Sequence, residues 1–155
     1  LQLSHILKYT LYETGQPTVK LRKEIALIRD YVDMYRQRMD PVLTDIKLEV
    51  SGDPGELLIA PMVLIPFIEN SFKHGLKGDE NRSFVDIHMT ITGMNLKFRV
   101  FNSKGKGDSP ELEQAKGIGI QNTRKRLELL YPGKHELEIE SIEDTYSVNL
   151  SLKLK

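Results

Sequence analysis

Two pairs of runs in which apolar and polar residues alternate constrain the fold of this chain most. The runs are Phe84–Thr92 with Leu96–Phe101, and Glu136–Ile142 with Tyr146–Leu154. Alternation with a period of two is typical of strands that bury one face, and short links containing Gly, Asn or Asp predict turns between paired strands. We therefore expect two β-hairpins in this chain.

The remaining segments predict helices and one more strand. Apolar residues recur every three or four positions over Leu1–Glu13, Leu21–Met39 and Gly119–Tyr131, which predicts amphipathic helices. A further helix is expected to begin at Pro61 and to end at Gly75, and Ile46–Val50 alternates like a strand. Strands largely joined by hairpins with helices between them favour an α+β fold, with helices on one face of a mixed sheet.

Composition excludes several classes of protein. The chain has 155 residues, which is about one domain, and it contains no cysteine, which excludes a disulfide framework, a thiolate zinc site and a cysteine nucleophile. Its 22 basic and 22 acidic residues argue against a nucleic-acid binder, which normally has a basic excess. Because the chain starts at Leu1 in the middle of a helical pattern, we expect it to be a fragment.

The helix expected at Pro61–Gly75 has an unusual polar face. Its apolar side contains Leu64, Ile65, Ile68, Ser71 and Phe72, and its polar side contains Pro66, Glu69, Asn70, Lys73 and His74. A carboxylate, an amide, an amine and an imidazole on adjacent turns could hold a phosphate chain and its Mg²⁺, which prefers oxygen ligands. The alternative is a solvated face on which Glu69 and Lys73 form an ordinary i,i+4 pair.

A pair of glycines precedes the last expected helix. Gly117-Ile118-Gly119-Ile120-Gln121-Asn122 follows a polar segment, Ser103–Lys116, that has no apolar period and is expected to be a mobile loop. Glycines allow a backbone to approach phosphates closely, and a helix N-terminus offers unpaired N–H groups. The alternative is a simple turn. The segment has neither the three glycines of a dinucleotide fingerprint nor a Walker lysine.

Together these segments resemble a known family. Residues 68–75, Ile-Glu-Asn-Ser-Phe-Lys-His-Gly, resemble the N box of the histidine-kinase ATPase (GHKL) superfamily, and residues 117–122, followed by Arg126-Leu127, resemble its second glycine box. The earlier stretches Leu3–Tyr9 and Val19–Arg38, the latter with Glu24, Tyr31 and Arg38, resemble the LytS-type sensor histidine kinases.

This resemblance implies a fold and a domain division. The expected fold is a two-layer α/β sandwich of the Bergerat type, in which helices cover one face of a mostly antiparallel sheet. Residues 1–40 would form the end of the dimerisation and phosphoacceptor region, with the acceptor histidine upstream. Residues 41–155 would form the ATP-binding catalytic domain. His5 is expected on a helix surface rather than as the acceptor.

The resemblance also implies a role for each site residue. Glu69 would be catalytic, and Asn70 would bind ATP and coordinate Mg²⁺. The other expected ATP-binding residues are Lys73 and His74 near the phosphates, Asn102 at the adenine, and Gly117, Ile118, Gly119, Ile120 and Asn122 around the triphosphate. The segment Lys104–Lys116 would form a lid.

One motif departs from the family pattern. The first glycine box of these ATPases normally carries an Asp that accepts a hydrogen bond from the adenine amine, whereas Asn102 occupies that position here. An Asn oxygen can still accept the bond, but the charge is absent and charged acceptors bind more strongly. Asn102 as an ordinary turn residue is the alternative.

The activity implied by the resemblance is transfer of the γ-phosphoryl group of Mg-ATP to an upstream histidine. Its partners would be ATP, the phosphoacceptor helix and a LytTR-type response regulator, with no nucleic acid. The full protein would be a membrane-anchored homodimer with this part in the cytoplasm of a bacterium, and the fragment itself would be monomeric. A degenerate module that acts through protein contacts is the main alternative, and an anti-sigma-type serine kinase is a third interpretation.

Overall fold

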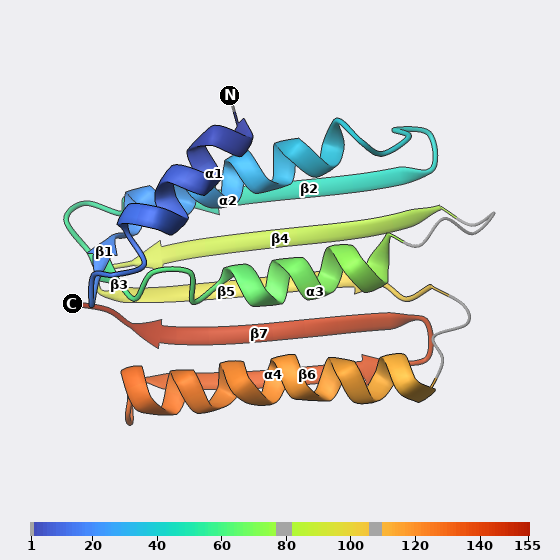
Figure 1. Ribbon diagram of the computed structural model, residues 1–155. Coiled ribbons are helices and arrows are strands. Elements are labelled where there is room, and N and C mark those ends of the chain that lie inside the picture. Colours follow the sequence, from blue (N-terminus) through green and yellow to red (C-terminus); the bar gives the residue numbers. More distant parts are fainter. Residues whose placement is uncertain (1, 77–81, 106–109) are drawn as a thin grey trace.

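The computed structural model describes residues 2–76, 82–105 and 110–155 of the chain. Its elements, labelled in Figure 1, follow one another along the chain as α1 (Gln2–Tyr12), β1 (Val19–Lys20), α2 (Leu21–Arg36), β2 (Thr44–Ser51), β3 (Leu58–Ile59), α3 (Ile65–Gly75), β4 (Ser83–Thr92), β5 (Asn95–Ser103), α4 (Pro110–Leu130), β6 (His135–Ile142) and β7 (Thr145–Lys153).

The main sheet contains five strands in the order β2-β4-β5-β7-β6. β2 pairs with β4 in parallel, and the other neighbours are antiparallel. The predicted hairpins are confirmed, with Ile91 opposite Leu96 in one and Ile142 opposite Thr145 in the other. β1 and β3 form a separate two-stranded sheet that the sequence pattern did not predict, because each has only two residues.

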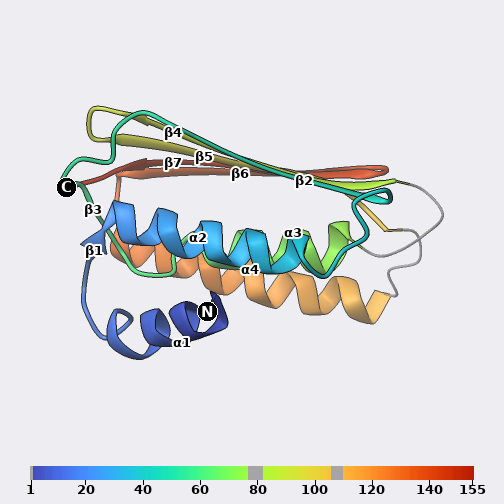
Figure 2. The same cartoon turned by 90° about the horizontal axis from the view of Figure 1, so that it is seen from above.

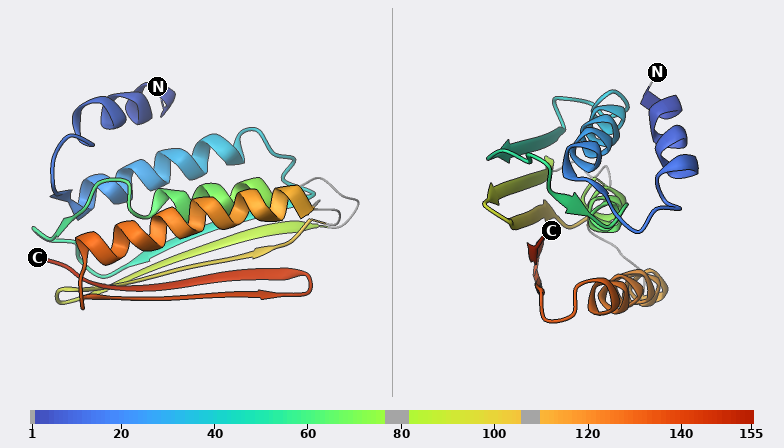
Figure 3. Two further views of the ribbon diagram at one scale, coloured as in Figure 1. Left: turned by 60° about the horizontal axis from the view of Figure 1, so that its bottom comes forward. Right: turned by 90° about the vertical axis from the view of Figure 1, so that its left-hand side faces the viewer.

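Helices α2, α3 and α4 cover one face of the sheet, and none of the described helices lies on the other face (Figures 2 and 3). Side chains buried between the layers form one core, which includes Ile28 of α2, Phe67 of α3 and Leu127 of α4. The Phe67 ring lies 6.2 Å from the ring of Phe98 in β5. This arrangement confirms the predicted α+β sandwich with helices on one face of a mixed, mostly antiparallel sheet.

Helix α1 lies outside this layer, on the side of α2 turned away from the sheet (Figure 2). The buried Tyr9 hydroxyl donates a hydrogen bond to the carboxylate of Glu24 on α2. None of the helices in the described segments is long and apolar enough to cross a membrane. The side chain of His5 is outside the described part of the structure.

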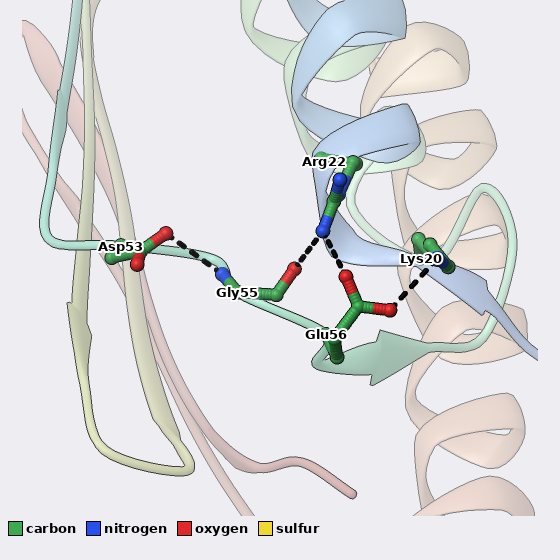
Figure 4. Close-up of polar contacts among 5 residues, drawn as sticks. All are labelled: Lys20, Arg22, Asp53, Gly55 and Glu56. Carbon is green, nitrogen blue, oxygen red and sulfur yellow. Dashed lines mark hydrogen bonds and ion pairs between the residues drawn. The ribbon is translucent and has the colours of Figure 1, made fainter.

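The start of α2 is tied to the loop before β3 by charged side chains (Figure 4). Glu56 accepts from Arg22 and forms an ion pair of 2.8 Å with Lys20, and Arg22 also donates to the carbonyl of Gly55 at 2.5 Å. These neighbouring cations lower the pKa of the Glu56 carboxyl. The groups are exposed, so the contacts fix the path of the loop more than they stabilise the fold.

Helix α3 begins later than predicted, at Ile65 instead of Pro61. Residues 61–64 form a turn in which Met62 has a φ of 55°. A regular right-handed helix cannot include this left-handed conformation, so α3 begins after it. Pro66 consequently lies in the first turn of α3, where no intrahelical donor is lost. Its position inside the predicted helix had no explanation from the sequence alone.

Helix α4 begins earlier than predicted, at Pro110 instead of Gly119. The expectation of a loop over 104–116 was therefore wrong for residues 110–116, which are helical, while residues 106–109 lie outside the described residues. Pro110 suits the first helical position. The helix was not predicted from the sequence because this segment has no apolar period and contains two glycines, which have poor helix propensity. Gly117 and Gly119 lie inside α4 and not before it.

Candidate functional site

A pocket of about 230 Å³ lies between α3 and α4. The α3 residues that line it are Pro66, Glu69, Asn70, Lys73 and His74, and α4 contributes Gly119 and Ile120. The structure thus brings together six residues that the sequence predicted as site residues, from two segments about 50 positions apart. Packing of both helices on the same sheet produces this juxtaposition.

The expected division of α3 into two faces is largely observed. All five members of the predicted apolar face are buried. On the polar side Glu69 and Lys73 are exposed, but His74 is only 6% exposed. His74 is buried because the chain after β5 returns over the end of α3, where the backbone N–H of Gly105 donates to the His74 carbonyl at 3.2 Å.

The expected alternative for α3, an ion pair between Glu69 and Lys73, does not form. Oε1 of Glu69 instead accepts a hydrogen bond of 3.0 Å from the hydroxyl of Tyr31 on α2. Lys73 forms no ion pair with the residues that the structure describes, so its ammonium group is available at the pocket. The polar groups that face the pocket from this part of α3 are therefore a carboxylate, an amide and a cation.

Asn102 lies near the end of β5, between Val85 and Tyr146 in the sheet register, and is 0% exposed. Its Nδ2 donates to the carbonyl of Ser103 at 2.7 Å. Its Oδ1 is buried and has no hydrogen-bond partner among the described residues. Because the Ser103 carbonyl requires a donor, the amide orientation is fixed and an acceptor oxygen is left without a partner.

The other expected ATP-binding residues lie on α4. Asn122 is exposed and does not line the pocket. Gly117 and Ile118 lie in the preceding helical turn, and the side chain of Ile118 is outside the described part of the structure. Thr123, one turn after Gly119, is buried and donates to the Gly119 carbonyl at 3.0 Å.

A buried polar cluster, which the sequence analysis did not identify, holds the segment that leads into α3. Arg126 of α4 donates to the carbonyls of Pro61 and Met62 at 2.6 and 3.2 Å. Tyr131 accepts from the N–H of Ala60 at 2.8 Å. Glu24 on α2 is fully buried beside this segment, and burial raises the pKa of its carboxyl to about 7. The position of Glu24 in the helical pattern did not indicate that its carboxyl would be buried in this cluster.

Within the described segments, no group of three His, Asp or Glu side chains lies close enough to hold a metal ion alone. Mg²⁺ commonly takes only one or two protein ligands and completes its shell with phosphate oxygens and water. The amide oxygen of Asn70 at the pocket is a donor of the right kind for such a shared site. The donor set therefore fits Mg²⁺ bound together with a phosphate chain.

By sequence, the chain is similar to part of a sensor kinase. No family model matches it. Over 123 residues it is 35% identical to the sensor protein kinase HptS of Staphylococcus aureus (strain USA300), a match that covers 79% of this chain and 20% of HptS. The chain therefore spans about a fifth of the length of this curated relative.

Solved structures of histidine kinases share the fold. The catalytic domain of ThkA aligns with a TM-score of 0.58 at 16% identity, over 88% of this chain and 93% of that domain. ThkA in complex with the response regulator TrrA aligns with a TM-score of 0.57 at 17% identity, over 99% and 48% of the two chains. Full-length ShkA in complex with AMPPNP aligns with a TM-score of 0.62 at 15% identity, over 99% and 34%.

These likenesses show the fold of histidine kinase catalytic domains and a partial sequence similarity to a sensor kinase. The narrower LytS-type assignment stays a prediction. The division of the chain at residue 40 also stays a prediction, although α2 contributes Leu21, Ile28 and Val32 to the common core.

Proposed function

We propose that this chain is the ATP-binding catalytic part of a two-component sensor histidine kinase, which transfers the γ-phosphoryl group of Mg-ATP to a histidine of the same protein or its dimer partner. The observation that carries this proposal is the α3/α4 pocket, where Glu69, Asn70 and Lys73 face the Gly119 backbone. A carboxylate, a metal-binding amide and a cation next to a glycine backbone suit a phosphate chain better than any neutral ligand.

Each pocket residue then has a role. Asn70 holds Mg²⁺, and Lys73 neutralises phosphate charge. Gly117 to Ile120 bring backbone close to the triphosphate, with His74 closing the end of the pocket. Mg²⁺, when bound, supplies charge neutralisation for the transferred group. The histidine nitrogen attacks the γ-phosphorus, the bond to the β–γ bridging oxygen breaks, and Glu69 orients the nucleophile or accepts its proton.

Asn102 supports an adenine site at the end of α3. Its buried Oδ1 lacks a partner among the described residues, and an unpaired buried acceptor is costly unless a ligand supplies a donor. The exocyclic amine of adenine is such a donor. ShkA, which shares the fold, is described in complex with a nucleotide. ATP as the substrate is consistent with both observations.

The partners of the full protein follow from the same assignment. A response regulator would receive the phosphoryl group, and ThkA, which shares the fold, is known in complex with one. The LytTR type of that regulator, a homodimer and an anchor in the bacterial inner membrane are further parts of the proposal. Its support is the resemblance of residues 3–38 to LytS-type kinases.

Calorimetric titration of Mg-ATP into the 155-residue chain tests the proposal. The wild type should bind, and Asn70→Ala should lose the part of the affinity that depends on Mg²⁺. Asn149→Ala on β7 is a matched control, because Asn149 alternates with Val148 and Leu150 and so faces away from the helices. Equal ATP affinity of wild type and Asn70→Ala, with and without Mg²⁺, contradicts the metal site.

The degenerate-module alternative is favoured by one observation, the Asn at the adenine-reading position. If the wild type binds no nucleotide with or without Mg²⁺, this alternative replaces the kinase. Transfer of labelled phosphate from ATP to a serine of a protein partner, with no label on histidine, would indicate an anti-sigma-type serine kinase.

A further inference from the structure

We propose that Tyr31 of α2 is a positioning residue for Glu69, which its hydroxyl holds at the wall of the α3/α4 pocket. This inference rests on the proposed function. It adds a residue that the N box and glycine boxes do not contain, and it links the pocket to a helix that does not line it.

The first observation is the hydrogen bond itself. The Tyr31 hydroxyl donates to Oε1 of Glu69 at 3.0 Å, from 38 positions earlier in the chain. Glu69 is exposed and forms no ion pair with any described residue, and its other oxygen accepts no hydrogen bond from them. An exposed glutamate has many rotamers, so a single fixed donor is what restricts this side chain.

The second observation is how the Tyr31 ring is held. It stacks on Phe72 with a centroid distance of 6.0 Å and an interplanar angle of 25°, and it lies 5.4 Å from Tyr35. Tyr35 in turn stacks on Phe72 at 4.2 Å and 15°. Phe72 is buried and lies three residues after Glu69, on an adjacent turn of the same helix. Aromatic packing therefore aims the hydroxyl along α3 toward the carboxylate.

The third observation concerns protonation. Burial, with the nearby charge of Glu69, raises the pKa of the Tyr31 hydroxyl above its ordinary value. The hydroxyl therefore keeps its proton throughout the working pH range and acts only as a donor toward Glu69. One carboxylate oxygen is used by this bond, while the other remains available to the nucleophile or to a water in the pocket.

The two helices therefore have different roles at the site. α3 carries the group that touches the reactants, and α2 fixes its rotamer. Loss of one such hydrogen bond should slow phosphoryl transfer roughly fivefold to tenfold. It should leave the affinity for Mg-ATP nearly unchanged, because Asn70, Lys73 and Asn102 are not touched.

A double-mutant cycle tests the proposal in the full kinase with its phosphoacceptor histidine. Tyr31→Phe removes the hydroxyl and keeps the ring, Glu69→Ala removes the acceptor, and the third variant combines both. Tyr12→Phe is the matched control, since Tyr12 is 71% exposed and lies on α1, which contributes no residue to the lining of the pocket. The readouts are the phosphorylation rate at saturating Mg-ATP, the dissociation constant of Mg-ATP and the melting temperature.

We expect Tyr31→Phe to lower the rate as stated and to have no further effect when Glu69 is already Ala. Equal slowing by Tyr31→Phe in both backgrounds would mean a merely structural role, and an unchanged or increased rate would also overturn the proposal. If Glu69→Ala retains full activity, the positioning proposal fails while the kinase assignment stands. If the wild type neither binds Mg-ATP nor becomes phosphorylated, both the proposed function and the positioning role of Tyr31 are wrong.

Discussion

Gly75, the last residue of α3, lies directly against the side chain of Asn102 in β5. A Cβ built on Gly75 would come to 2.9 Å from Nδ2 and 3.0 Å from Cβ of Asn102. The sequence predicted that the helix ends at Gly75, and the φ of this glycine is not positive. Close approach to Asn102, and not backbone freedom, is what requires glycine at this position.

We therefore predict that Gly75→Ala disturbs both the stability of the chain and the proposed adenine site. The added methyl group cannot be accommodated without moving Asn102 or the end of α3, and overpacking of this kind costs about 1–3 kcal/mol. Urea unfolding should show the loss of stability, and calorimetry should show weaker ATP binding.

Gly119→Ala is the matched control for stability, because a Cβ at Gly119 meets no atom within 4 Å. The same change in this helix interior should stabilise the chain by about 0.5–1 kcal/mol. It should also weaken ATP binding if the nucleotide approaches this backbone as proposed. A loss of stability as large as that of Gly75→Ala would contradict the packing argument.

A second prediction concerns base selectivity at Asn102. The Ser103 carbonyl fixes the amide so that Oδ1 is an acceptor without a partner among the described residues. In the proposed site this oxygen would accept from the amine of adenine and would oppose the carbonyl of guanine. Asn102→Ala should weaken ATP by about 0.5–1.5 kcal/mol and reduce the preference over GTP. Paired calorimetric titrations with ATP and GTP measure both effects.

Asn102→Asp separates charge from geometry at the same position. It places a carboxylate oxygen where Nδ2 now donates to Ser103 at 2.7 Å, so a favourable contact becomes a repulsion. We expect a less stable chain and no gain in ATP affinity at neutral pH. Stronger ATP binding by Asn102→Asp would show that the Ser103 contact does not determine the orientation.

The architecture could be predicted because it depends on local periodicity, whereas the meeting of α3 and α4 at one pocket was expected from the family resemblance. The hairpins follow from strict alternation, and the polar side of α3 from spacing on one helix. The starts of α3 and α4, which were predicted wrongly, depend on other physical effects. Met62 adopts a left-handed conformation next to carbonyls held by Arg126, and α4 continues through two glycines with poor helix propensity.

Contacts between distant segments were the part that no pattern predicted. The bond from Tyr31 to Glu69 joins α2 to α3, and the cluster around Glu24 joins α1, α2 and α4. Each residue alone is an ordinary member of an amphipathic helix. Glu24 and Tyr31 were visible only as part of the LytS-like stretch, which gave no indication of what they contact.

A third prediction concerns the first half of α4. Each glycine inside a helix costs about 1 kcal/mol relative to alanine, so the turns around Gly117 and Gly119 are the weakest of α4. Their N–H groups are used within the helix, so a phosphate chain that accepts from them must first open these turns. We expect fast hydrogen exchange at residues 111–118 and a change there on adding Mg-ATP. Residues 123–130 are the internal control, and an identical response of both halves would contradict the prediction.

The last prediction is a pH dependence of stability that arises from Glu24. The pKa of this buried carboxyl is about 7 in the folded chain against an ordinary value of 4.5, and burial is the largest cause. Between these values the folded chain binds a proton that the unfolded chain has lost, so the stabilisation is complete below about pH 4.5 and disappears as the pH rises through 7.

The loss amounts to roughly 3 kcal/mol, since each pKa unit corresponds to about 1.4 kcal/mol. Glu24→Gln keeps the shape and stays neutral, so its free energy of unfolding should fall less between pH 5 and pH 8.5 than that of the wild type. Glu138→Gln on the exposed side of β6 is the control and should follow the wild type. Urea unfolding at a series of pH values measures the difference, and parallel curves for wild type and Glu24→Gln would show that Glu24 is ionised without cost in the folded chain.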